Sequence, residues 1–133
     1  SELELGERCS ALAFVPGQPD HLVAGVLTGT VFRLNVRDGQ QLADPLRGPG
    51  EIADFAFHPD GSRLAAAGLN SVITLWETEY YQEVLTLKGL GPIASTHGWS
   101  PSVAFSHDGK SLASTNPDGS HNLWISGRAT VDN

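Results

Sequence analysis

The sequence has few of the residues on which most binding chemistries depend. Its 133 residues include one cysteine, Cys9, no methionine, and 8 basic residues against 15 acidic ones. A single cysteine excludes an intramolecular disulfide framework and a cysteine-rich zinc site. The formal charge of −7 predicts a surface that repels phosphate backbones, so nucleic acid is not expected as a partner.

Long apolar runs and helical periods are also missing. No run approaches the ~20 apolar residues that span a bilayer, and Ser1-Glu2-Leu3-Glu4 shows no basic segment of a leader peptide. We expect a soluble chain without membrane contact. A removed leader would leave the compartment open, and one free cysteine weakly favours the cytoplasm. No window of a dozen residues has a 3.6-residue period. Glycine and proline, 15 and 8 residues, indicate many turns.

The sequence does contain an internal repeat. Phe14, Phe57 and Phe105 each end a short apolar run, and they recur at similar intervals along the chain. Trp76 and Trp124 are separated by the same interval as the last two phenylalanines, with a leucine at the corresponding place in the first unit. Two independent anchors with one period indicate a duplicated structural unit.

Each unit is predicted to form four short strands. The apolar runs are four to six residues long and are bounded by turn pairs such as Asp60-Gly61 and Asp108-Gly109, which is typical of hairpins. Runs that are apolar on both sides of the pleat, such as 12–15, need a neighbouring sheet on each face. The expected fold class is therefore all-β, a stack of four-stranded sheets. In the second unit the strands are expected at 52–57, 63–67, 72–77 and 83–88.

These units resemble WD40 repeats, the blades of β-propellers. The family pattern is a Val-Ala-Phe strand, an Asp-Gly turn, Leu-Ala-Ser and a final Trp-Asp pair. It is matched by 103–109, by 112–114 and by Trp76-Glu77. The third unit keeps Trp124 without the acid, and the first keeps neither residue. The resemblance covers essentially the whole chain and implies a β-propeller segment of three four-stranded blades.

The resemblance also implies a division of the chain. A partial propeller would cover 1–133, with the outer strand of a preceding blade at 1–6. The blades would follow at 7–48, 49–89 and 90–133. The second unit begins its outer strand at Val84, eight residues after its tryptophan, so the third blade is expected to lack that strand. Closed propellers typically have 4–8 blades, so other blades, from a parent propeller or a second copy, are expected to complete the ring.

In the family, a Trp–Ser/Thr–Asp–His hydrogen-bond network often braces a blade. Residue by residue, only the third unit has candidates for all four positions. Ser114, Asp118 and His97 are also the ingredients of a hydrolytic triad, but the tryptophan favours a structural brace. The predicted brace consists of Trp124, Ser114, Asp118 and His97.

Other chemistry has little support in the sequence. The five histidines form no pair at metal-ligand spacing, so no metal is predicted. No glycine-rich phosphate loop precedes a helix, so no cofactor is predicted. Cys9 stands at the entry to an inner strand, which favours a buried structural thiol. We therefore predict that the chain is not an enzyme.

The remaining candidate residues are those of the top-face loops, where propellers usually bind partners. The stretch 89–101 is the longest departure from the repeat, and Trp99 within it is the best aromatic anchor. The predicted function is a non-enzymatic protein–protein interaction scaffold. The alternatives are an architectural piece that completes a larger propeller or complex and, less favoured, a propeller enzyme. The candidate contact residues are Arg8, Glu51, Asn70, Trp99 and Asp118.

Overall fold

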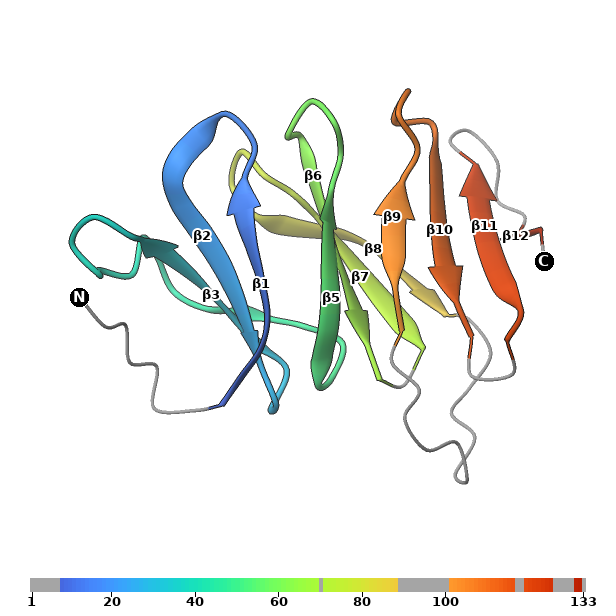
Figure 1. Ribbon diagram of the computed structural model, residues 1–133, viewed down its shortest axis with the longest axis horizontal. Coiled ribbons are helices and arrows are strands. Elements are labelled where there is room, and N and C mark those ends of the chain that lie inside the picture. The colour runs from blue at the N-terminus through green and yellow to red at the C-terminus, as the bar shows by residue number, and fades with distance from the viewer. Residues whose placement is uncertain (1–7, 70, 89–100, 117–118, 126–130, 133) are drawn as a thin grey trace.

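The computed structural model describes residues 8–69, 71–88, 101–116, 119–125 and 131–132. These residues form three antiparallel four-stranded sheets and no helix (Figure 1). The first sheet contains β1 (Cys9–Val15), β2 (Gln18–Val26), β3 (Thr30–Asn35) and β4 (Leu46–Arg47). The second contains β5 (Ile52–Phe57), β6 (Arg63–Gly68), β7 (Val72–Glu77) and β8 (Gln82–Lys88). The third contains β9 (Val103–Phe105), β10 (Ser111–Thr115), β11 (His121–Ile125) and β12 (Val131–Asp132).

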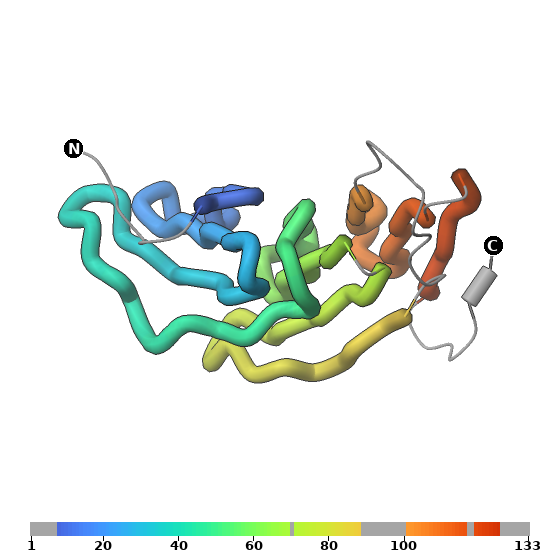
Figure 2. The backbone as a smooth tube through the Cα atoms, turned by 90° about the horizontal axis from the view of Figure 1, so that it is seen from below, coloured from blue at the N-terminus to red at the C-terminus, as the bar shows by residue number. Residues whose placement is uncertain are grey.

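Within each sheet the strands pair in chain order, and the sheets follow one another side by side along the chain (Figure 1). The first strands β1, β5 and β9 lie next to each other, because β5 contacts both of the others. In the second sheet β8 lies at the opposite edge from β5 (Figure 2). This is the arrangement of consecutive propeller blades, and the predicted all-β fold class is confirmed.

The prediction that the third blade lacks its outer strand is wrong. A two-residue strand, β12, pairs with β11, with Val131 opposite Trp124. In the second sheet Glu83 lies opposite Trp76, so the partner of the tryptophan follows at the same distance along the chain in both units. The sequence interpretation counted the second outer strand from Val84, one residue after the partner of Trp76, although β8 begins at Gln82. That offset left no room for a strand at the end of the third unit.

Apolar packing joins the first sheet to the second. Val15, Val23 and Val31 form one core cluster with residues of β5, β6 and β7. Ile52 is completely buried in this cluster and sits against Gly25, where a Cβ atom would lie only 2.6 Å from the Cβ of the isoleucine. The absence of a side chain at position 25 therefore lets the two sheets approach closely.

The second and third sheets are joined by apolar and polar contacts. Ala65, Ala67 and Ile73 form a buried cluster with Val103 and Leu112, where small residues again allow close approach. On the side of the β5–β6 hairpin, the ring of His58 meets that of Phe105 edge-on, with centroids 5.4 Å apart. The second sheet is thus covered on both faces, as its doubly apolar strands require.

Other predictions concern residues at the margins of the described chain. The predicted outer strand at 1–6 lies outside the described residues, and the boundaries between repeats stay a prediction. Cys9 is exposed, so the prediction of a buried thiol is wrong. It pairs with Val26 at the beginning of β1, and a register shift separates it from Ala11, which packs towards the second sheet. The described residues contain no helix long and apolar enough to cross a membrane.

Candidate interaction surfaces

One face of the first sheet is apolar and only partly covered. Leu12 and Phe14 point away from the second sheet and are 63% and 61% exposed. Beside them, Ala24, Phe32 and Leu34 belong to a small buried cluster on the same side of the sheet. We call Leu12, Phe14 and this cluster the open face. It presents an apolar strand surface to solvent.

The corresponding residues of the second sheet are packed. Phe55 and Phe57 stand at the places in the repeat that Leu12 and Phe14 occupy in the first unit. Phe55 is only 8% exposed, and Phe57 packs against the same core as the first sheet. The repeat therefore uses this face to dock onto the sheet that precedes it. In the first sheet the same positions remain accessible.

The far face of the third sheet shows the complementary pattern. Ala56 and Leu75 of the second sheet pack against the third sheet. Their equivalents in the third unit are Ala104, which is exposed, and Leu123, which is half-buried. Each sheet thus has two different apolar faces. One face carries the equivalents of Leu12 and Phe14, and the other carries the equivalents of Ala56 and Leu75. Inside the molecule, the first kind of face packs against the second kind on the neighbouring sheet.

Two carboxylates stabilise the turns of the β5–β6 and β9–β10 hairpins. Ser62 donates its backbone N–H to Asp60 over 2.8 Å, and hydrogen bonds from Ser62 lower the pKa of that carboxyl. Asp108 occupies the equivalent turn of the third unit, and hydrogen bonds from the Ser106 hydroxyl and the Lys110 N–H lower its pKa. These acids are therefore engaged in turn formation.

Glu77, at the place of the family's aspartate, holds the β7–β8 hairpin. Its carboxylate accepts backbone N–H groups from Glu79, Tyr80 and Gln82 over 2.9, 3.0 and 3.2 Å. Desolvation by itself would raise the pKa of Glu77, but these hydrogen bonds lower it overall. In the first unit Asn35 accepts the N–H of Arg37 in the same way, so this turn is capped without an acid.

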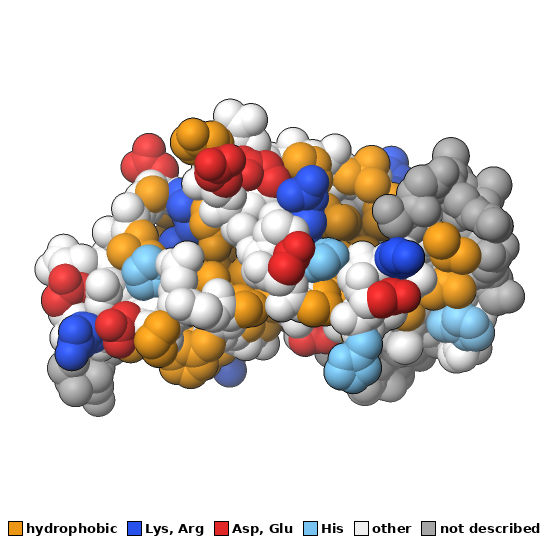
Figure 3. Space-filling model, turned by 90° about the horizontal axis from the view of Figure 1, so that it is seen from above, with side chains coloured by type: hydrophobic (Ala, Val, Ile, Leu, Met, Phe, Trp, Pro, Cys, Tyr) orange, Lys and Arg blue, Asp and Glu red, His pale blue; other side chains and the backbone are white. Residues whose placement is uncertain are grey.

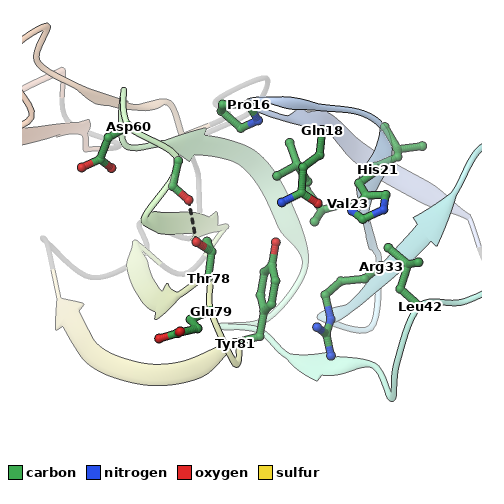
Figure 4. A pocket seen from close by; sticks show the side chains of 13 residues that line it. Pro16, Gln18, His21, Val23, Arg33, Leu42, Asp60, Thr78, Glu79 and Tyr81 are labelled. Atoms are coloured by element: carbon green, nitrogen blue, oxygen red, sulfur yellow. Dashed lines mark hydrogen bonds between the residues drawn. The ribbon is translucent and has the colours of Figure 1, made fainter.

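On the same side, a cavity of about 350 Å³ lies between the first sheet and the β7–β8 hairpin (Figure 4). Arg33 of β3 lines one wall, and its guanidinium carbon lies 4.3 Å from the ring centre of Tyr81 on the other. Figure 3 views the molecule from this side and shows acidic, basic, histidine and apolar side chains interspersed over it. Arg33 was not among the residues predicted from the sequence. Its signal was a charged residue in a strand position where the other units have leucine.

The structure describes two of the five predicted contact residues. Arg8 and Glu51 are exposed, and their backbone carbonyls accept the N–H groups of Leu27 and Leu69 over 3.3 and 3.1 Å. Each residue therefore has its backbone fixed on a neighbouring hairpin while its side chain faces solvent. Asn70, Trp99 and Asp118 lie outside the described residues.

Half of the predicted brace in the third blade is described. Ser114 is buried and Trp124 is half-buried, on the same face of the sheet. Asp118 and His97 lie outside the described residues, so the brace stays a prediction.

The structure adds a buried amide pair that sequence analysis missed. Asn122 donates its Nδ2 to Oδ1 of Asn116 over 2.9 Å, and Asn116 donates to the Ser120 hydroxyl over 3.1 Å. The alternation from Trp124 back to Asn122 was the available signal, because both residues lie on the same face of β11.

Residues 39–77 match the family described as WD40, "WD domain, G-beta repeat". This segment is similar to a WD40 repeat. Two curated relatives are "Protein HIR1" from two strains of Cryptococcus neoformans var. neoformans serotype D, each 32% identical over 99 residues. The match covers 62% of this chain and 11% of each relative.

Solved structures show the same fold. The crystal structure of RRP9 WD40 repeats and the structure of U3-55K each superpose with a TM-score of 0.77 at 20% identity. Each match covers 98% of this chain and 39% of the other. The resemblance of the sheets to WD40 blades is therefore confirmed at the level of the fold, and the chain spans well under half the length of these relatives.

The described parts of the chain offer little to a metal ion. Within them, no group of three or more His, Cys, Asp or Glu side chains is arranged to bind one. His58 lies 2.7 Å from Asp60 through its Nδ1. That contact belongs to the hairpin turn described above.

Proposed function

We propose that this chain is a non-enzymatic protein-interaction scaffold of WD40 type, and that the open face is its principal interaction surface. The supporting observation is the exposure of Phe14, at 61%, where the equivalent Phe57 of the second sheet packs against its neighbour. Fully burying a side chain such as Leu12 or Phe14 contributes about 1.5–3 kcal/mol. A partner that covers both therefore gains a substantial free energy of binding.

The partner that fits the open face is another blade of the same kind. Inside the chain, the equivalent face of the second sheet packs on Val23 and Val31, and that of the third sheet on Ala65, Ala67 and Ile73. The complementary surface is thus a strand face of small or β-branched residues. We assign the occupant to a flanking blade of a larger propeller, which agrees with the 39% share that this chain covers of solved WD40 chains.

The top-face loops, which include Arg8 and Glu51, are proposed as a second contact surface. The backbone of each residue is held by a hydrogen bond to a hairpin, at 3.3 and 3.1 Å. Fixing the backbone lowers the entropy lost when an exposed side chain engages a partner. The proposal extends to Asn70, Trp99 and Asp118, with proteins rather than nucleic acids or membranes as the partners, in agreement with the formal charge of −7.

An enzymatic role is disfavoured by the use of the acids. Asp60, Glu77 and Asp108 all accept hydrogen bonds from the turns on which they stand. A carboxylate engaged in this way, with a lowered pKa, is a poor general acid or base at neutral pH.

Sedimentation velocity across a wide range of protein concentration tests the proposal. Head-to-tail contacts between unlike faces form a closed ring where the rotation between blades brings the ends together, and an open array where it does not. If the occupant is a flanking blade rather than a second copy, we expect association of the wild-type chain that does not stop at a closed dimer. The double variant Leu12→Ser/Phe14→Ser should remove it. The matched control is Val84→Ser/Leu85→Ser on β8, where the side chains are 47% and 50% exposed but at an outer edge. It should associate like the wild type.

The outcomes separate the occupants. A discrete dimer that the first double variant dissolves would assign the open face to a second copy and overturn the flanking blade. A monomer of 14.1 kDa at every concentration, with a sharp thermal transition that neither variant alters, would overturn the open face as an interaction surface.

A further inference from the structure

The cavity between the first two sheets has an ionic group where the repeat would place an apolar one. Arg33 lies in β3 one residue before Leu34, and Leu75 and Leu123 lie one residue before the two tryptophans at the equivalent positions. Leu75 packs against the cluster between the second and third sheets. At the first interface a guanidinium takes that place. The repeated fold therefore does not require a charge at position 33.

Few of the N–H donors of the Arg33 guanidinium form hydrogen bonds to the described residues. Its Nη2 donates to the carbonyl of Asp44 over 3.2 Å, and its Nε is buried without a partner among the described residues. An arginine has five N–H donors in a fixed planar fork. A buried polar atom that lacks a partner costs free energy, and in native proteins such atoms call for an explanation such as a functional role or an unseen partner.

Tyr81, on the opposite wall, has a backbone conformation that the first unit assigns to glycine. Its φ is +56°, in the left-handed region, while Gly39, five residues after Leu34 as Tyr81 is after Trp76, has φ +73°. A tyrosine in this region is strained. The three hydrogen bonds to Glu77 hold the turn in place. Burial raises the pKa of the Tyr81 phenol, with Arg33 opposing that shift, so the hydroxyl stays a neutral donor at neutral pH.

The cavity wall around Arg33 presents further donors. Gln18 and His21 stand on the same side as Arg33, while Thr78 and Glu79 lie beyond the Tyr81 ring (Figure 4). The acidic lining residues, Asp60 and Glu79, stand in hairpins of the second sheet. They lie on the far side of the cavity from Arg33 (Figure 4). One end of the cavity is thus cationic and rich in donors, and the other is acidic.

We propose that this cavity binds the carboxylate side chain of an acidic residue in a peptide segment of a partner protein. The carboxylate pairs with the guanidinium of Arg33, whose planar fork matches a carboxylate in a bidentate geometry. The peptide backbone and neighbouring side chains lie against the Tyr81 ring and towards the acidic end. The site lies on the face of the first sheet opposite the open face, so it does not depend on how the open face is covered.

A carboxylate fits this charge distribution better than a phosphate. Arg33 is the one permanently charged cation among the lining residues, while Asp60 and Glu79 carry two negative charges at the other end. A phosphate group carries about −1.5 to −2 at neutral pH. A single guanidinium balances a monoanion, and the two acids repel a dianion more strongly.

The test uses the side-chain Nε–H resonance of Arg33 in 15N-labelled protein, assigned with the Arg33→Leu variant. The probe is the blocked tripeptide acetyl-Gly-Glu-Gly-amide, with the glutamine analogue, acetate and inorganic phosphate as comparisons. We expect a saturable shift with the glutamate peptide and at least tenfold weaker binding of the glutamine peptide and of acetate.

Three variants locate the binding. Arg33→Leu places the residue of the other units at this position and should fold, with binding weakened at least tenfold, as followed by the Thr78 and Tyr81 backbone amides. Tyr81→Gly introduces the residue of the first unit and should weaken binding without loss of stability. Arg37→Leu, at an exposed arginine paired with Asp20 at 3.7 Å, is the matched control and should bind as the wild type does.

Each contrary result overturns one part of the proposal. Equal affinity for acetate would overturn the peptide as the source of the carboxylate. Tighter binding of phosphate would overturn the carboxylate assignment. No saturable shift with any probe, together with higher stability of Arg33→Leu, would overturn the site and leave Arg33 and Tyr81 a packing pair. None of these results bears on the sedimentation experiment, so a failure of this site is distinguishable from a failure of the open face.

Discussion

The carboxylate of Asp54 on β5 accepts the backbone N–H of Val103 on β9 over 2.9 Å and thereby joins the second sheet to the third. The same carboxylate accepts the N–H of Phe55 at 3.0 Å through its other oxygen. The equivalent residue of the first unit is Ala11, whose methyl group cannot accept a hydrogen bond and packs against the apolar cluster between the first two sheets. At this position of the repeat the two interfaces are thus held by different forces.

Replacing Asp54 should weaken the second interface. Hydrogen bonds to charged groups contribute roughly 1.5–3 kcal/mol, and Asp54→Ala leaves the Val103 N–H without its partner. We expect a loss of about 1–3 kcal/mol in the free energy of unfolding, measured by urea denaturation. Asp44→Ala, at an exposed acid whose side chain accepts no hydrogen bond from the described residues, should change stability by less than ~0.5 kcal/mol. Equal effects of the two substitutions would contradict the role of this contact.

Close packing at the first interface should make Gly25 intolerant of a side chain. In Gly25→Ala the new Cβ atom would meet Ile52 at 2.6 Å, so one of the sheets must shift. Overpacking of this kind costs roughly 1–3 kcal/mol. The double variant Gly25→Ala/Ile52→Gly should lose less stability than the sum of the two single variants, because the glycine at position 52 removes the Cβ and both Cγ atoms that the new methyl group would meet. Strict additivity of the thermal or urea data would contradict the contact.

The buried amide pair of the third blade should be sensitive to truncation. Asn122→Ala removes the hydrogen bond that Oδ1 of the buried Asn116 accepts over 2.9 Å, and a hydrogen bond of this kind contributes about 0.5–1.5 kcal/mol. His121→Ala, at the adjacent exposed position, is the control and should have little effect. Urea denaturation measures both. If Asn122→Ala is as mild as the control, the amide pair does not stabilise the blade.

The turn carboxylates should make the protein sensitive to acid. The folded-state pKa values of Asp60 and Asp108 lie below their ordinary 3.8, and that of Glu77 below its ordinary 4.5. Their stabilisation is therefore present above about pH 4.5 and is lost as the pH falls through the lowered values, because the unfolded chain binds these protons first.

Neutral analogues test this acid sensitivity. The triple variant Asp60→Asn/Glu77→Gln/Asp108→Asn should show a flatter dependence of unfolding free energy on pH below about 4.5 than the wild type. The control changes Asp44, Glu51 and Glu79 to their amides and should keep the wild-type slope. A wild-type slope in the first triple variant would show that the turn hydrogen bonds do not depend on charge.

Much of the fold could be predicted from local patterns. Short runs ending at Phe14, Phe57 and Phe105, with Asp-Gly turns after the last two, predicted β strands and hairpins because alternation and turn chemistry act over a few residues. The outer strand of the third blade was missed because the spacing was counted to Val84 instead of to Glu83, the residue opposite Trp76. It is defined by its pairing, Val131 opposite Trp124.

The candidate sites were less accessible to sequence analysis. The four-residue brace could be proposed because the family supplies a template, but the pairing of Asn122 with Asn116 depends on how two strand ends meet. Arg33 and Tyr81 are distant in the chain and belong to different units, and no local pattern relates them. Their stacking at 4.3 Å follows from the way one sheet lies on the next.

The sequence by itself determined the repeat, the strands and the turns, because those depend on residues close together in the chain. The tertiary structure decided which apolar faces are covered. Leu12 and Phe55 are equivalent in the repeat and both apolar, yet Leu12 is 63% exposed and Phe55 is 8% exposed. The difference arises because burial depends on the neighbouring sheet, and only the packing of whole sheets places a neighbour over one face and leaves the other to a partner.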